Sequence, residues 1–259
     1  MSTLTTCTDT ASRPTSAQVG DTLFQIDLNQ IIVCNGAGPP PTWAPYEPRN
    51  ESSLWVMGRN TWGQLGNNST TQALSPVKIV DSGVKQVATS MKNSIFLKED
   101  GTLWGMGAGG SNSGGGGGAL GAGAASMQQV PIQIDDSVAQ CTIGSDNSDS
   151  HTLYVKLDGS LWATGRNYDA MFGTGNNSWA SSVFEIMSSG VAQVHAGSTY
   201  VLVLKTDGSL WGCGNNSDGQ LGLGHNSNQN TFQQIVASGV VQISAGRRDV
   251  SHYIKSDGS

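Results

Sequence analysis

The chain has 259 residues and a formal net charge of −6 at pH 7. Only 12% of the residues are charged, whereas Gly occurs 35 times, about twice its ordinary share of ~7%; this composition excludes ordinary disorder, which needs high net charge and few apolar residues. The 13 Lys and Arg residues are spread over the whole chain and no run of ~18 apolar residues occurs, so we expect neither a nucleic-acid partner nor membrane insertion.

The N-terminal residues and the cysteine spacing indicate in which cellular compartment the chain is expected. The N-terminal stretch "MSTLTTCTDTASRPTSAQ" has no basic start and no apolar core, so we do not expect a secretory signal there. The cysteines form no Cys-x-x-Cys pair and are irregularly spaced at Cys7, Cys34, Cys141 and Cys213. We therefore expect free thiols in a reducing compartment rather than a disulfide framework or a metal site.

A small β-hairpin is predicted in the N-terminal segment. The alternating stretch "TLFQID" is followed by "LNQ" as a turn and by "IIVCNG" as the returning strand. Three consecutive prolines, 39–41, then stiffen an extended segment. Because one hairpin is marginal alone in water, it must pack against something else. We expect residues 1–48 to form an attachment module whose contacts involve Phe24, Ile26, Trp43 and Tyr46.

The rest of the chain is built from a repeat. Its anchor is a Leu-Trp pair, and the four tryptophans are separated by 49, 58 and 49 residues, each with a glycine three residues later. These structural repeat residues are Trp55, Trp104, Trp162 and Trp211, and Gly58, Gly107, Gly165 and Gly214. The repeats are expected over residues 49–100, 101–158, 159–207 and 208–259, within a domain that spans residues 49–259.

Further features recur inside each repeat. "GQLG" follows the tryptophan at Gly63 and Gly219, reads "AMFG" in the third copy, and is delayed to "GALG" in the second by a Gly-rich insertion. Alternating apolar stretches then lead to Asp-Gly pairs, which are strong two-residue hairpin signals because both central positions of the turn need positive φ. Each repeat is thus predicted to be several short antiparallel strands.

Such a unit cannot bury its apolar faces alone, but stacking neighbours around an axis buries them. We expect each Trp to pack between adjacent blades, with its N–H on an acceptor, and the glycines to allow close backbone approach. The fold class predicted is all-β, a β-propeller of four recognisable repeats with a small N-terminal hairpin segment.

The pattern Asp-Gly-Ser-Leu-Trp-x-x-Gly-x-Asn, then Gly-Gln-Leu-Gly, Pro, Gly-Val and Ala-Gly, resembles the regulator of chromosome condensation repeat over residues 51–259. The resemblance implies a β-propeller with four-stranded blades, usually seven in that family. The chain departs from the pattern in the Gly-rich insertion of the second copy, the missing Gly-Gln of the third and the extra residues "AGRRDVSHY" of the fourth.

Two arrangements of the four repeats remain open. The first repeat starts at its Leu-Trp strand, and residues 251–255 read as the strand that precedes such a pair. If strand 54–58 pairs with strand 251–255, a compact ring of four blades closes and removes the edge strands. This phase slightly favours closure. The other arrangement is an arc that is part of a larger propeller, whose remaining blades lie in a longer natural chain.

The N-terminal segment resembles a short module of tailed-phage structural proteins. The matching residues are Arg13, Pro14, Val19, Gly20, Asp21, Phe24, Asp27, Asn29, Asn35, Gly36 and Trp43. In such proteins the module implies a place near the attachment end of a fibre or on the particle surface, often in a homo-oligomer. The alternative is a plain hairpin that caps the propeller.

No pattern for catalysis, metal or cofactor binding stands out. GxSxG, HExxH and Walker-type loops do not occur, the Gly run lacks the Lys that phosphate binding needs, and we expect His151 and His252, at comparable strand positions, to be structural. Asp135 and Asp136 are expected to be solvated surface acids. We expect no enzyme, no metal and no cofactor, and take rim-loop residues as binding candidates: Asn60, Asn167, Asn215 and Asn216.

The leading functional hypothesis is a non-enzymatic bacteriophage virion structural protein, a tail fibre or surface decoration. It would attach to other virion proteins by its N-terminus, form a homo-oligomer, and display a propeller that touches a host surface glycan or protein. Its location would be the virion, assembled in the host cytoplasm. The alternative is a free bacterial protein-binding propeller of the inhibitor or effector kind. A nucleotide exchange factor for a small GTPase is less favoured because the chain is acidic and lacks a basic tail.

Overall fold

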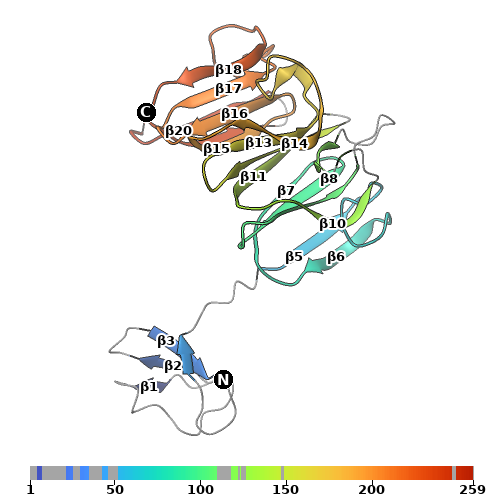
Figure 1. Cartoon of the computed structure of the whole chain (residues 1–259), viewed down its shortest axis with the longest axis vertical. Helices are drawn as coiled ribbons and strands as arrows, with labels where there is room; N and C mark the ends of the chain where they lie inside the picture. Colours follow the sequence, from blue (N-terminus) through green and yellow to red (C-terminus); the bar gives the residue numbers. More distant parts are fainter. Residues whose placement is uncertain are drawn as a thin grey trace. The chain divides into compact units, whose positions relative to one another are not determined.

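The computed structural model divides the chain into two compact units, Met1–Arg49 and Asn50–Ser259, which are described separately (Figure 1). Within the second unit the structure describes residues 52–109, 118–121, 123, 127–146, 149–246 and 249–258. In the first unit it describes four strands by their backbone alone.

The N-terminal unit contains one four-stranded sheet. Its strands are β1 (Thr5–Cys7), β2 (Thr22–Gln25), β3 (Gln30–Cys34) and β4 (Trp43–Pro45), in the order β1-β2-β3-β4. The antiparallel β2–β3 pair confirms the predicted hairpin, while β1, which was not predicted, runs parallel to β2. The side chains of the expected attachment residues Phe24, Ile26, Trp43 and Tyr46 lie outside the described residues, so their role stays a prediction.

The second unit is a stack of antiparallel four-stranded sheets, which confirms the all-β blades. The first blade comprises β7 (Val84–Thr89), β8 (Asn93–Lys98), β9 (Leu103–Gly107) and β10 (Gln128–Asp135). The second comprises β11 (Val138–Ser145), β12 (Ser150–Lys156), β13 (Leu161–Gly165) and β14 (Ala180–Met187). The third comprises β15 (Val191–Ala196), β16 (Tyr200–Lys205), β17 (Leu210–Gly214) and β18 (Gln229–Val236).

Two half-blades flank these sheets. The N-terminal half-blade pairs β5 (Leu54–Gly58) with β6 (Ala73–Val80), which correspond to the third and fourth strands of a blade. The C-terminal half-blade pairs β19 (Val240–Ala245) with β20 (Ser251–Lys255), which correspond to the first and second. The sequence repeat is therefore out of phase with the blade, because each repeat supplies the last two strands of one blade and the first two of the next.

The expectation of a closed four-blade ring is wrong for this structure. Among the described residues, β5 pairs with β6 alone and β20 with β19 alone. The two half-blades lie at opposite ends of the stack (Figure 1). The repeats form an open arc.

The reason for the open arc lies in how adjacent blades touch. In a ring of four, each blade must turn by about a quarter of a circle, which splays the outer strands apart. Here the outer edges remain in hydrogen-bond contact: backbone N–H groups of Asn68, Gly123 and Gly175 donate to carbonyls in the fourth strand of the next blade at 2.8–2.9 Å. With inner and outer edges both in contact, the inclination per blade is too small for four blades to close.

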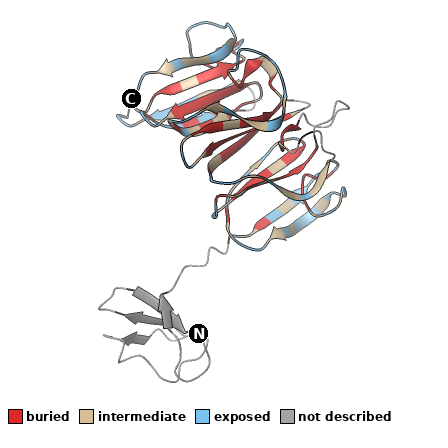
Figure 2. Cartoon of the chain, viewed as in Figure 1, coloured by how far each residue is buried: buried red, intermediate tan, exposed pale blue. Residues whose placement is uncertain are grey.

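The hydrophobic core lies between the blades rather than within them (Figure 2). Ile95 and Leu97 of the first blade pack with Ile143 and Tyr154 of the second in one buried cluster. Equivalent clusters join the second blade to the third and each half-blade to its neighbour. The second strand of every complete blade is therefore almost wholly buried (Figure 2).

The repeat tryptophans lie on the third strand of each blade. Trp104, Trp162 and Trp211 are half-buried and pack against the interblade clusters, whereas Trp55 is 53% exposed because no second strand lies beside β5. In all four, the indole N–H has an acceptor, as expected: it donates to a hydroxyl two residues earlier at 2.8–2.9 Å, a partner that was not named from the sequence. The glycines that follow end the third strand with φ between 101° and 120°.

Helical structure is limited to short turns in the described part of the chain, such as the 3₁₀ segment η3 (Tyr168–Ala170). None of the helices there has the length and hydropathy needed to cross a membrane.

Candidate protein-binding surface

A ladder of glutamine side chains joins the inner strands. Gln140 on β11 donates from Nε2 to the carbonyl of Val194 at 2.9 Å and accepts the Val194 N–H at 3.0 Å. Gln86 on β7 makes the same pair of bonds with Cys141. Each carboxamide thus pairs with both the backbone N–H and the backbone C=O of one residue in the next blade, as a neighbouring strand would. These bonds hold adjacent blades at a fixed spacing.

The inner strands line a groove of about 380 Å³. Its walls come from residues 86–89, 140–145 and 195–197, with Ala245 at one end. Many of the polar side chains along it are already engaged: His195 accepts the Ala245 N–H at Nδ1, and Thr142 accepts the Ala196 N–H. These hydrogen bonds therefore hold adjacent inner strands together along the groove.

The long loops between third and fourth strands all leave one end of the strands, which we call the loop face. Asn60, Asn167 and Asn216 begin these loops. Each is buried, accepts the N–H of the residue five positions later at 2.9–3.0 Å, and donates across the loop to backbone carbonyls. These three carboxamides build the loops and do not reach the surface, so contact with a partner falls to their exposed neighbours.

The fourth candidate, Asn215, lies in a polar bridge between two loops. Its Nδ2 donates to Asp169 Oδ2 at 3.1 Å, and its Oδ1 accepts from Ser217 and Gln220. Asp169 stands at positive φ, 53°. The loops of the second and third blades are thereby fixed to each other, and binding by Asn215 itself stays a prediction.

The strongest feature of the loop face is a cluster around Arg166, which we call the Arg166 cluster. The guanidinium lies 3.8 Å from the ring centroid of Tyr168 and 4.0 Å from that of Trp179, so it is held by both rings. It also forms a largely buried ion pair with Asp149 at 3.0 Å. Trp179 is half exposed. A rigid cation with an accessible aromatic surface results.

A second cation–aromatic pair occupies the first loop. Lys92 Nζ lies 4.9 Å above the ring of Trp62, beside the exposed Met91. Neither group was predicted from the sequence, because neither recurs from repeat to repeat as the asparagines do. A signal for the Arg166 cluster was present in the third copy, where Arg166 and Tyr168 stand at the positions of Asn215 and Ser217 of the fourth copy.

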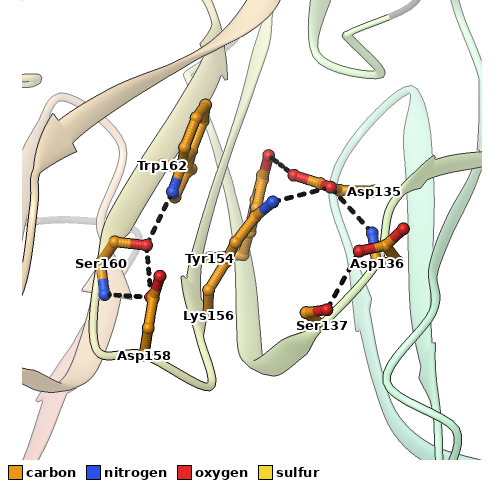
Figure 3. A network of polar contacts seen from close by, with 8 residues as sticks. All are labelled: Asp135, Asp136, Ser137, Tyr154, Lys156, Asp158, Ser160 and Trp162. Atoms are coloured by element: carbon orange, nitrogen blue, oxygen red, sulfur yellow. Dashed lines mark hydrogen bonds and ion pairs between the residues drawn. The ribbon is translucent and has the colours of Figure 1, made fainter.

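The opposite end of the strands, the turn face, is held by Asp-Gly-Ser/Thr turns (Figure 3). Asp158 accepts from the N–H and the hydroxyl of Ser160, and this hydroxyl accepts the Trp162 indole N–H. The hydroxyl bond, with smaller help from the backbone N–H, lowers the pKa of the carboxyl. Equivalent bonds lower the pKa of Asp100 and Asp207.

Asp135 is a structural residue between blades rather than a solvated acid (Figure 3). It accepts from the Tyr154 hydroxyl at 2.6 Å and from Lys156 Nζ at 2.9 Å, both on the next blade. Burial alone would raise the pKa of Asp135, but these two hydrogen bonds outweigh it and lower the pKa. Burial together with Asp135 raises the pKa of Tyr154.

The remaining titratable groups are packed inside. Burial lowers the pKa of His151 to about 4 and raises that of Cys141 to about 12. His151 packs edge-on against Phe172, as a structural residue does. His252, in contrast, is exposed on β20 and stands three residues before the strand-end lysine where His151 stands five, so the two positions are not equivalent. Among the described residues, no three of His, Cys, Asp and Glu are grouped as metal ligands.

Sequence comparison detects the repeat directly. A model of the regulator of chromosome condensation (RCC1) repeat matches residues 51–97 and 207–248, and a second model of the same repeat matches residues 191–220. The second blade lies outside these ranges, yet it has the same strand order. Its Gly-rich insertion lengthens the repeat without changing the blade.

Solved structures show the same architecture. Human WBSCR16 superimposes with a TM-score of 0.62 at 19% identity, over 92% of this chain and 57% of that one. Prp20p from Saccharomyces cerevisiae, a structure described with its binding to Gsp1p and histones, gives 0.60 at 16% identity over 93% and 57%. Yeast RCC1 (Prp20) bound to Kap60 gives 0.61 at 16% identity over 93% and 56%.

These likenesses concern the fold, and the chain spans just over half the length of the three structures. The matches to the repeat models, the strand order of the blades and the similar solved structures agree on one architecture. The chain carries regulator of chromosome condensation (RCC1) repeats, folded as consecutive blades of an RCC1-like β-propeller.

Proposed function

We propose that this chain is a non-enzymatic protein-binding propeller that meets its partner through the loop face. The observation that carries this proposal is the Arg166 cluster, in which Arg166 is fixed between Tyr168 and the half-exposed Trp179. Trp, Tyr and Arg are the residues that dominate the energy of protein interfaces. Their fixed geometry reduces the ordering cost of binding, and rigid scaffolds commonly carry function on such loops.

The setting that we propose is the surface of a bacteriophage particle. Residues 1–48 would dock on other virion proteins, and the propeller would project as a fibre part or decoration that touches a host surface glycan or protein. The likeness of residues 13–43 to tailed-phage structural modules supports this, as does the separation of Met1–Arg49 as a compact unit of its own. Assembly would take place in the host cytoplasm.

Electron microscopy of purified particles with an antibody against residues 60–250 tests the setting. Label at a fixed place on the particle is expected, and the label should disappear when residues 1–48 are deleted. Particles that carry no label with the full chain would contradict the virion setting.

The loop face is tested separately with Trp179→Ala. The expected result is at least tenfold weaker binding of the purified chain to host cells, because a half-exposed indole at the centre of the patch is lost. Leu157→Ala is the matched control, since Leu157 is an exposed apolar residue on the turn face. Equal binding by both variants would show that the partner does not use the Arg166 cluster.

A free bacterial protein-binding propeller is the second candidate. The loop face favours it because the described partners of Arg166, which are Asp149, Tyr168 and Trp179, all belong to the propeller unit. It predicts that deletion of residues 1–48 leaves partner binding intact and that particles carry no label. Nucleotide exchange on a small GTPase is the least favoured candidate, because Prp20p, whose structure is described with its binding to Gsp1p, shares 16% identity with this chain.

A further inference from the structure

We propose that the groove along the inner strands binds an extended, uncharged peptide segment of a protein partner. The segment would pair with the free backbone edge of β11 at the first joint, where a joint is the contact between the inner strands of two adjacent blades. This site belongs to the inner strands and not to the loop face. The inference therefore goes beyond the proposed function and can fail independently of it.

The free edge of β11 is identified by the backbone groups of Cys141. Both of these groups bond to Gln86, on the side of β11 that faces away from β12. Cys141 and Tyr154 are therefore a non-hydrogen-bonded pair of the antiparallel ladder, and such pairs alternate with hydrogen-bonded ones along the strands. The N–H and C=O groups of Ile143 and Ser145 consequently point to the same side as those of Cys141.

At the second and third joints, a side chain two residues after the inner glutamine accepts a backbone N–H of the next blade. Thr142 accepts the N–H of Ala196 at 3.4 Å, and His195 Nδ1 accepts the N–H of Ala245 at 3.2 Å. At the first joint the corresponding position is Ala88, whose methyl group cannot accept a hydrogen bond. The first joint thus lacks an acceptor that the later joints have.

The N–H that lacks this acceptor is that of Ile143. It stands two residues after Cys141, as Ala196 stands two residues after Val194. None of the hydrogen bonds formed within the described part of the chain uses the Ile143 N–H. Both Ile143 and Ala88 line the groove. Water can bond to this N–H in the free chain, and a peptide carbonyl would replace that water.

The lining of the groove selects for an uncharged ligand. It comprises residues 86–89, 140–145 and 195–197 with Ala245, and none of these residues is Lys, Arg, Asp or Glu. A phosphate group or a carboxylate would lose its water there without gaining a cation in return. A peptide backbone carries no charge, and its alternating donors and acceptors match those of a strand edge.

The inner glutamines show that this edge recognises the peptide group. The carboxamide of Gln86 offers one donor and one acceptor, as a peptide unit does, and it pairs with both backbone groups of Cys141. An extended segment that continues from this point would place its own peptide units opposite Ile143 and Ser145. Hydrogen bonds along an exposed strand edge supply the affinity in this mode of recognition.

The size of the groove fits a short segment of extended chain. Its volume of about 380 Å³ lies within the ~300–1,000 Å³ that is typical of ligand clefts. The lining stretch of β11, residues 140–145, corresponds to about 20 Å of strand. A ligand with one amide group would fill only part of this length, whereas successive peptide units repeat with the period of the strand.

The site does not depend on how the propeller is completed. Its walls come mainly from β7, β11 and β15, which belong to the three complete blades. Blades added at either end of the arc would pack beside the half-blades. They would not enter the joint between β7 and β11, so the unused N–H would remain.

Amide NMR of the full chain tests the site, with a capped hexapeptide of alternating Thr and Ala as the probe. We expect saturable shift changes at the amides of Ile143 and Ser145 and none at Ala196, whose N–H is already bonded to Thr142. Acetamide, a single carboxamide, and maltotetraose, a neutral glycan, are the comparison probes. Each should bind about tenfold more weakly, because it cannot pair with two successive residues of the edge.

Two variants act on the unused N–H directly. Ala88→Thr should supply the missing acceptor, as Thr142 does at the next joint, and weaken peptide binding about tenfold. Thr142→Ala should free the N–H of Ala196, so that the peptide then shifts the Ala196 amide as well. Ala192→Thr, at an exposed position of β15 outside the groove, is the control and should bind as the parent does.

Three results would overturn the proposal. Unchanged amides of Ile143 and Ser145 at the solubility limit of the hexapeptide would show that the edge binds no peptide. Equal binding by Ala88→Thr and the parent would place the peptide elsewhere. Tighter binding of maltotetraose than of the hexapeptide would make the groove a glycan site.

Discussion

The carboxamide of Gln86 holds both backbone groups of Cys141 on the next blade, with Nε2 2.8 Å from its carbonyl oxygen and Oε1 3.1 Å from its amide nitrogen. Nothing else in the two strands pairs them as a ladder would. Together with the apolar clusters and the outer backbone hydrogen bonds between blades, this side chain links adjacent blades, and it is one place where we expect substitutions to act on the scaffold.

Replacing Gln86 by Ala should lower the free energy of unfolding by roughly 1–3 kcal/mol, because a partly buried N–H and carbonyl of Cys141 lose their partners. Urea unfolding followed by tryptophan fluorescence measures the change. Gln234→Ala, at an exposed position of β18, is the matched control and should stay within about 0.5 kcal/mol of the parent. Equal losses would show that the bonds made by Gln86 are not what holds the blades.

Ser160→Ala should raise the pKa of Asp158 toward its ordinary value of 3.8, since the hydroxyl bond is the largest cause of the lowered pKa. A lowered carboxyl pKa contributes stability above its ordinary value, and this stability is lost as the pH falls through the folded-state pKa. The variant should therefore lose less stability on acidification. Carboxyl NMR titration checks this, with Asp100 and Asp207 as unchanged internal controls in the same spectrum.

His151 should make stability depend on pH between its ordinary pKa of 6.5 and about 4, because the buried ring stays neutral in the folded chain while the unfolded chain takes up a proton. Its contribution is fully present above pH 6.5 and falls by up to about 1.4 kcal/mol per pH unit below it. Burial lowers the pKa of His195 as well, which adds to the slope.

Urea unfolding at a series of pH values measures this slope. His151→Gln should remove part of it, whereas Phe172→Leu, which loosens the same packing without removing a titrating group, should leave the slope in place. A slope unchanged by His151→Gln would place the titration elsewhere.

Gly165→Ala should be more destabilising than Gly190→Ala by about 1–3 kcal/mol, although both glycines have positive φ. At Gly165 a Cβ would lie 2.6 Å from the Ser150 carbonyl oxygen, while at Gly190 it would meet nothing within 4 Å. Because φ is 106° at Gly165 and 81° at Gly190, the difference in thermal midpoints reports the crowding at the end of the third strand together with the difference in φ. Equal thermal midpoints of the two variants would show that crowding at Gly165 does not limit stability.

The sequence by itself determined the repeat and most of its local structure. The Leu-Trp strands and the glycines at strand ends follow from residue-level rules, because each depends on contacts a few residues apart. The Asp-Gly hairpins lie where predicted, but the expected turn with positive φ at both central residues is wrong, because only the glycines of these pairs have positive φ. The hydroxyl that accepts each indole N–H lies two residues before the tryptophan, within the same local pattern. These elements were predictable without knowing where the blades lie.

The tertiary structure decided what depends on the angle between blades. That angle is set by side chains such as Gln140 and by backbone bonds such as Gly175 to Asn230, which join residues about 55 positions apart. The position of the chain ends within the repeat suggested a closed ring of four blades. In the structure the angles between successive blades are too small for this, and the two half-blades stay apart. The Arg166 cluster likewise needed coordinates, because the sandwich between Tyr168 and Trp179 closes only when a long loop folds back over its own first residue.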